Sequence, residues 1–158
     1  MSLNTVLAAV RTLVATGVGG TVTVHDGVRW ARDDVTFRSL MRDATNSRLN
    51  AWMVSHGGTD ERVFGQNNLN IMEHELICVG LYAVDDPGSG TSMTTELAFR
   101  TQLEAVRTQL RQDFTPSTAF NSSPPRTEVF EVRMFHGHLC HYAEVRFEAE
   151  ERIQYTGS

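Results

Sequence analysis

Four residues near the end of the chain carry side chains that bind metal ions in other proteins. They are His136, His138, Cys140 and His141. A structural zinc site needs four such ligands and a catalytic site three. Side chains alternate between the two faces of a strand, so His138 and Cys140 share one face, His141 points to the other, and His136 falls in a turn. This spacing favours histidines that serve the fold, and we expect neither a metal nor another cofactor.

The residue types that catalyse reactions also lack the spacing that catalysis needs. Cys78 and Cys140 lie in apolar, strand-like segments, where a thiol is usually unreactive. No serine occupies a G-x-S-x-G turn. Three acidic pairs are adjacent in sequence: Asp33-Asp34, Asp85-Asp86 and Glu150-Glu151. Neighbouring residues of a strand or helix point in different directions, so we interpret these pairs as solvated charges and predict that the protein is not an enzyme.

Composition indicates one folded domain that interacts with other proteins. The chain has 158 residues, 41% of them hydrophobic, and a formal net charge of −5. That length suits a single domain over residues 1–158. All 14 basic residues are arginine, a side chain that pairs well with carboxylates at interfaces but that is also frequent in proteins of GC-rich genomes. An acidic chain with scattered arginines is poorly suited to holding nucleic acid, and its two cysteines indicate a reducing compartment.

Hydrophobic periodicity and turn residues predict an α+β fold with a mixed, mostly antiparallel sheet flanked by two main helices. The expected elements are a helix over 3–16, a strand over 21–25, an irregular or partly helical segment over 29–43, strands over 48–56 and 69–84, a helix from about 92 to 113, a surface connection over 115–125, and a final hairpin. No segment reaches the 18 apolar residues of a membrane-spanning helix.

The final hairpin has the clearest pattern. A two-residue turn at His136-Gly137 would join strands 127–135 and 138–147. Pairing outward from this turn places Val132 opposite His141, Phe130 opposite Ala143 and Glu128 opposite Val145. One face of the hairpin is then largely apolar, and we expect it to supply much of the core. The residues expected there are Phe130, Val132, Met134, Leu139, Val145 and Phe147.

Two segments are candidates for contacts with other proteins. Residues 57–68 are mostly polar, which predicts a mobile projecting loop with Asp60, Glu61 and Arg62 as its charged contacts. Trp30, with Arg29 and Arg32 beside it, combines the two residue types most enriched at interface hot spots. Burial of Trp30 in the core, with solvated arginines, explains the same residues equally well.

Three stretches resemble, in this order, small tail-terminator proteins of long-tailed bacteriophages and of phage-derived particles such as gene transfer agents. They are VRWARDDVTFRSLMRDATNSRLNAWMV, TELAFRTQLEAVRTQLRQ and EVRMFHGHLCHYAEV. The resemblance covers nearly the whole chain as an order of elements, and none of its motifs is as specific as a set of zinc ligands.

The resemblance implies a structural virion protein that forms a homo-oligomeric, typically hexameric ring. Such a ring sits on the end of the tail tube, stops its polymerisation and offers a surface to the head-completion protein, while DNA only passes through the lumen. The expected location is the head–tail junction of the virion, and the host cytoplasm during assembly. Two alternatives remain: a neck or head-completion protein, and a small-ligand or metal-binding α+β domain that uses the His136/His138/His141 hairpin.

Overall fold

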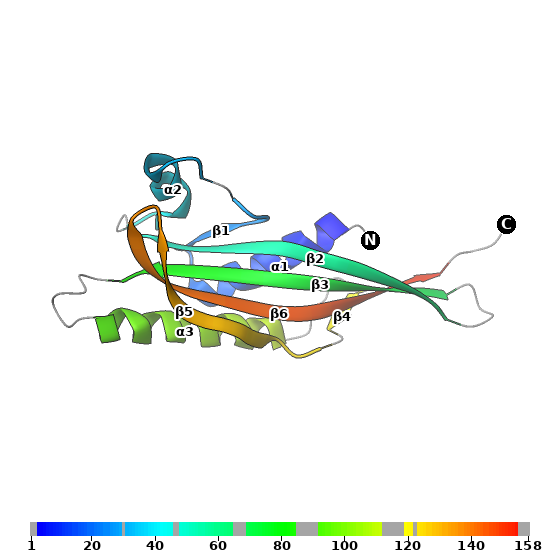
Figure 1. Cartoon of the computed structure of the whole chain (residues 1–158). Coiled ribbons are helices and arrows are strands. Elements are labelled where there is room, and N and C mark those ends of the chain that lie inside the picture. The colour runs from blue at the N-terminus through cyan, green and yellow to red at the C-terminus, as the bar shows by residue number, and fades with distance from the viewer. Residues whose placement is uncertain are drawn as a thin grey trace.

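A computed structural model describes residues 3–29, 31–45, 48–64, 69–84, 92–111, 119–121 and 123–154 (Figure 1). Its elements are α1 (Leu3–Val18), β1 (Thr23–His25), α2 (Asp34–Met41), β2 (Asn50–Phe64), β3 (Leu69–Ala83), α3 (Ser92–Arg111), β4 (Ala119–Asn121), β5 (Arg126–Phe135) and β6 (His138–Gln154). The strands form one mixed sheet in the order β1-β2-β3-β6, beyond which both β4 and β5 pair with β6. Only the β1–β2 pair is parallel among these ladders. The predicted α+β fold is confirmed.

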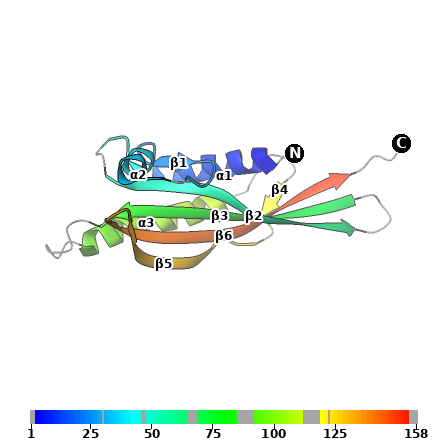
Figure 2. The ribbon, with the colours of Figure 1, turned by 45° about the horizontal axis from the view of Figure 1, so that its top comes forward.

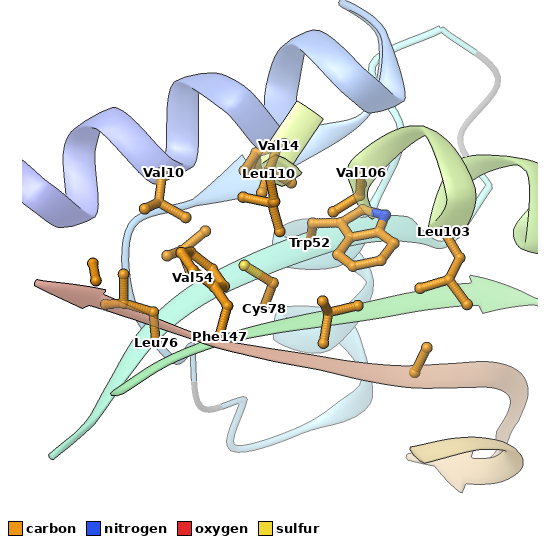
Figure 3. Packing of buried hydrophobic residues seen from close by; sticks show 14 of the residues in the cluster. Val10, Val14, Trp52, Val54, Leu76, Cys78, Leu103, Val106, Leu110 and Phe147 are labelled. Atoms are coloured by element: carbon orange, nitrogen blue, oxygen red, sulfur yellow. The ribbon is translucent and has the colours of Figure 1, made fainter. Parts of the chain in front are cut away.

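Helices α1 and α3 cover one face of the sheet and enclose the main core (Figure 3). Helix α1 buries Val6, Val10 and Val14, which recur every four residues and therefore form one stripe. From the sheet, Trp52 is fully buried and its ring lies 6.1 Å from that of Phe99 on α3. The two long amphipathic segments are thus helices as predicted, although Leu97 of the second is exposed.

A smaller core lies on the opposite face, beneath α2. It contains Phe37, Met41, Leu49, Ala51, Met53, Leu81 and Cys140. Helix α2 begins at Asp33, whose carboxylate accepts a hydrogen bond of 2.8 Å from the Thr36 amide. This bond satisfies one of the unpaired donors at the helix start and lowers the pKa of Asp33. Asp33 is exposed, as expected for a solvated charge, and it also caps the helix.

The hairpin of β5 and β6 has the predicted turn and register over most of its length. His136 and Gly137 both have positive φ, 46° and 84°, and they close the pair Phe135–His138. Val132 lies opposite His141, as predicted. The register shifts at a β-bulge between Thr127 and Val129, so Thr127, and not Glu128, pairs with Val145. A bulge adds one residue to one strand only, which pattern matching cannot detect.

The expected contribution of β5 to the core is wrong. Val145 and Phe147 of β6 are buried, but Phe130, Val132 and Met134 of β5 are 36%, 51% and 64% exposed. Strand β5 lies at the edge of the sheet, and the helices lie over more central strands (Figure 2). An alternating pattern identifies the face that a side chain points to, but it does not reveal whether a helix covers that face.

This exposure changes the expected effect of Phe130→Ala. Phe130 packs one face against the Phe99 ring at 5.8 Å, and Arg100 lies over it at 5.5 Å from the ring centroid. We expect Phe130→Ala to reduce the free energy of unfolding by about 1–2 kcal/mol, because the ring is only partly removed from water. Phe99→Ala, at a fully buried ring, should cost about 3–5 kcal/mol. Urea denaturation of both variants tests this difference, and equal losses would contradict the placement of β5.

Candidate functional site

Three strands of the sheet continue past the helices and form a projection. We call this projection the arm and define it as residues 57–64 of β2, 69–75 of β3 and 148–154 of β6. Figures 1 and 2 show it extending beyond the ends of α1 and α3. Its order is β2-β3-β6, and the short β4 pairs with residues 149–151 of β6 at its base. The arm begins at a register shift between His56 and Gly58, and such bulges change the twist and direction of a strand.

The arm corrects our prediction for residues 57–68. We expected a mobile loop, but residues 57–64 belong to β2, and residues 65–68 lie outside the described part of the chain. Gly58 to Phe64 pair with Glu75 to Leu69 in an unbroken antiparallel ladder. The sequence suggested a loop because the segment lacks an apolar face. Its strand is formed by backbone hydrogen bonds, which cannot be recognised from the types of side chain present.

A hydrogen-bonded group of side chains joins the three strands at the base of the arm. The Thr59 hydroxyl lies 2.7 Å from Nε2 of His56 and 2.8 Å from Nδ1 of His74. Nε2 of His74 lies 3.3 Å from Oε2 of Glu151. Since a hydroxyl has one hydrogen, Thr59 donates to one imidazole and accepts from the other. His74 and Glu151 are both buried, so Glu151 is not the solvated charge that we expected, and the group ties β2, β3 and β6 together.

Sequence reasoning missed this group, although a signal was present. His74 follows the same period of two as the buried Leu76 and Cys78, and Glu151 follows that of Phe147 and Ala149. Polar residues at positions of a strand that face the core are usually hydrogen-bonded. That expectation would have singled out His74 and Glu151.

The predicted contact residues Asp60, Glu61 and Arg62 lie next to one another on the β2 edge of the arm, and all three are exposed. Strand alternation puts Asp60 and Arg62 on one face and Glu61 on the other. Arg62 forms a 2.9 Å ion pair with Glu73. The Glu61 carboxylate accepts a hydrogen bond from the side-chain amide of Asn70. The arm therefore presents charges of both signs in fixed positions.

The second predicted surface lies at the other end of the sheet. Arg29 forms a 3.1 Å ion pair with Asp26, and Arg32 is exposed. Trp30 lies outside the described residues. Arg29 borders an open, mostly apolar pocket of about 330 Å³ between α2, the sheet and the hairpin turn. The pocket is lined by Val28, Arg29, Ala31, Phe37, Met41, Met53, Val79, Leu81, Phe135, His136 and Tyr142.

The three hairpin histidines do not converge. Nε2 of His138 lies 2.6 Å from Asp34 of α2, whereas Nε2 of His141 lies 3.0 Å from the Thr95 hydroxyl of α3, on the opposite face. The exposed His136 packs against the Phe37 ring at 5.1 Å. Within the ranges that the structure describes, no three His, Cys, Asp or Glu side chains are placed to hold one metal ion. Cys78 and Cys140 are buried, and desolvation raises the pKa of each thiol to about 12.

His141 gives a testable pH dependence. Burial lowers its pKa below the ordinary 6.5, and the charge of Glu96 only partly opposes this effect. In the unfolded chain His141 takes up a proton near pH 6.5, whereas in the folded chain it stays neutral at that pH. The free energy of unfolding should therefore fall as pH decreases from 6.5 towards the lower pKa of the folded state. We expect His141→Gln to lose less stability than the unchanged protein between pH 7 and 5. Urea denaturation midpoints of both proteins, measured between about pH 7 and 5, test this expectation. The same pH dependence in both proteins would contradict it.

No protein-family model matches the chain, and no curated protein sequence matches it significantly. Among the described residues, no helix is both long enough and apolar enough to cross a membrane.

Proposed function

We propose that the protein is a tail terminator of a phage or phage-derived particle. In this role, copies of the chain form a ring, typically of six, on the end of the tail tube. The ring stops tube polymerisation and provides the interface for the head-completion protein. The function is structural, requires no cofactor, and places the protein at the head–tail junction after assembly in the host cytoplasm.

The observation that carries this proposal is the placement of the two candidate surfaces. A terminator must contact the tube on one side and the head-completion protein on the other. The arm lies at one end of the sheet and α2 at the other (Figure 1). The arm carries Asp60, Glu61 and Arg62, and the pocket beside Arg29 is lined by residues of α2. Arg62 lies nine positions along β2 from Met53 at the pocket, or about 30 Å of extended strand. One subunit can thus reach two partners at once.

The arm suits recognition of the tube end because it is already ordered. A preformed surface loses little conformational entropy on docking, so more of the contact energy appears as affinity. Fixed charges of both signs also discriminate between correct and incorrect neighbours. We assign Asp60, Glu61 and Arg62 to the tube contact, and Arg29, Trp30 and Arg32 to a contact with a neighbouring subunit or with the head-completion protein.

The net charge is compatible with a passage for DNA. A ring of six chains would carry six times the formal charge of −5. Binding of DNA depends on neutralising its phosphates with basic groups. An acidic ring would let DNA pass without holding it.

Negative-stain microscopy of the purified protein, alone and mixed with tail tubes, tests the proposal. We expect rings that bind one end of the tube, and tubes that stop growing when the protein is added to polymerising tube subunits. Binding to the neck of filled heads, with no effect on tube growth, would instead identify a head-completion protein. Absence of any ring, both alone and on tubes, would exclude the terminator.

A further inference from the structure

Strand β5 has an outer edge that another strand could pair with. In the described part of the chain, β5 pairs only with β6. Three of its side chains, Phe130, Val132 and Met134, form an exposed apolar strip on one face. Natural edge strands are usually shielded by charges, proline or bulges. The bulge near Glu128 shields the start of β5. Along residues 129–135 the charges Glu131 and Arg133 lie on the face opposite the apolar strip, while Arg100 of α3 lies over Phe130.

The backbone groups that face outward can be identified from the turn. In a two-residue hairpin, the residues that flank the turn exchange both of their backbone hydrogen bonds, and such pairs alternate along the ladder. Phe135 is the flanking residue of β5, so the odd-numbered residues point their N–H and C=O groups towards β6. The even-numbered Phe130, Val132 and Met134 therefore point theirs outward.

The sequence of residues 129–135, VFEVRMF, reads similarly in both directions around Val132. An antiparallel pair of two such strands, related by a two-fold axis at Val132, places each side chain opposite a complementary one. Phe130 faces Met134 of the second copy, and Val132 faces Val132. On the other face of the sheet, Glu131 faces Arg133 of the second copy. Opposite charges and apolar pairs across strands both stabilise a sheet.

We propose that β5 is a self-recognition edge, through which two copies of this chain form a two-fold dimer with a continuous sheet. About six backbone hydrogen bonds would form between the outward groups of the two strands. This contact is isologous, unlike the head-to-tail contacts that close a ring. It goes beyond the proposed function and is tested on the purified protein without phage components.

Cross-linking tests the register. Val132→Cys puts two thiols opposite each other at a Cα separation of about 5.5 Å, which a disulfide can span. Met134→Cys is the matched control: it is more exposed than Val132, but its symmetry mate lies four residues away along the pair, about 13 Å. The native Cys78 and Cys140 are buried. We expect rapid disulfide dimers of Val132→Cys under mild oxidation and few of Met134→Cys. Equal cross-linking of both would overturn the proposal.

Charge reversal tests the complementarity. We expect Glu131→Arg and Arg133→Glu each to weaken the dimer roughly tenfold, because each places like charges opposite one another twice. The double variant restores opposite charges across the two-fold axis and within each strand, so its dissociation constant should return to within about twofold of the original value. Sedimentation equilibrium over a dilution series measures these constants. A double variant as weak as the single ones, or a monomer at every concentration, would overturn the proposal.

Discussion

Removal of the indole of Trp52 is expected to reduce the free energy of unfolding by about 3–5 kcal/mol, the usual cost of deleting a large, fully buried aromatic side chain. Trp52 has no exposed surface, and its indole N–H lies 3.4 Å from the side-chain oxygen of Gln102 on α3. Its ring also covers Gly80 on β3, its cross-strand partner. A Cβ atom added at Gly80 would lie 2.5 Å from Cζ2 of the indole.

These two residues should therefore be strongly coupled. Gly80→Ala alone should cost about 1–3 kcal/mol, because the methyl group displaces the indole from its packed position. In the Trp52→Ala background the same substitution should cost close to nothing, because the methyl group then enters the space that the indole left.

Urea denaturation of the two single variants and the double variant measures this coupling. Gly20→Ala is the control, since nothing lies within 4 Å of a Cβ atom at that position. Additive losses in the double variant would show that the indole does not rest on Gly80.

Shortening the arm is expected to abolish capping while the domain stays folded. Asp60 and Glu73 are cross-strand partners, so residues 61–72 can be replaced by a short turn that contains Asn-Gly. The side chains of His56, Thr59, His74 and Glu151 are all retained. Glu151 loses Met72 as its β3 partner but stays paired with Ala119 of β4, so stability should change by no more than about 1–2 kcal/mol. Tubes should grow beyond their proper length or fail to join heads.

Tube lengths measured by microscopy and assays of particle infectivity or gene transfer test this expectation. A full-length arm with Asp60→Asn, Glu61→Gln and Arg62→Gln separates the role of charge from that of shape. Normal tubes with the shortened arm would exclude the arm from tube recognition. Deleting Thr59 to Gln66 is a poorer test, because it removes the hydroxyl that contacts the buried His74.

The sequence was most informative where local patterns decide the structure. The apolar periodicity of residues 3–16 predicted α1, and the His136-Gly137 turn predicted a hairpin register that is confirmed from Phe135 back to Val129. Both depend on contacts between residues close in the chain.

Predictions failed where distant elements decide the structure. Phe130 has the alternation of a core residue, but it is exposed because β5 is an edge strand. The polar residues 57–64 form a strand because β3 supplies backbone hydrogen bonds over the whole of that length. His74 contacts both Thr59 and Glu151, which lie far apart in sequence, and neither composition nor periodicity predicts such a contact.

The place of β6 in the sheet has a consequence for synthesis of the chain. β6 lies between β3 and the edge strands β4 and β5, yet among the strands that the structure describes it is the last to be made. The main core needs Ala143, Val145, Phe147 and Ala149 from β6, so it cannot close until translation has passed Ala149. At about 5–20 residues per second, the chain spends roughly 7 to 30 s between the synthesis of Leu3 and that of Ala149. During that interval Trp52, Leu76 and Cys78 lack their final neighbours, and the nascent chain is a natural client for chaperones that shield apolar strands.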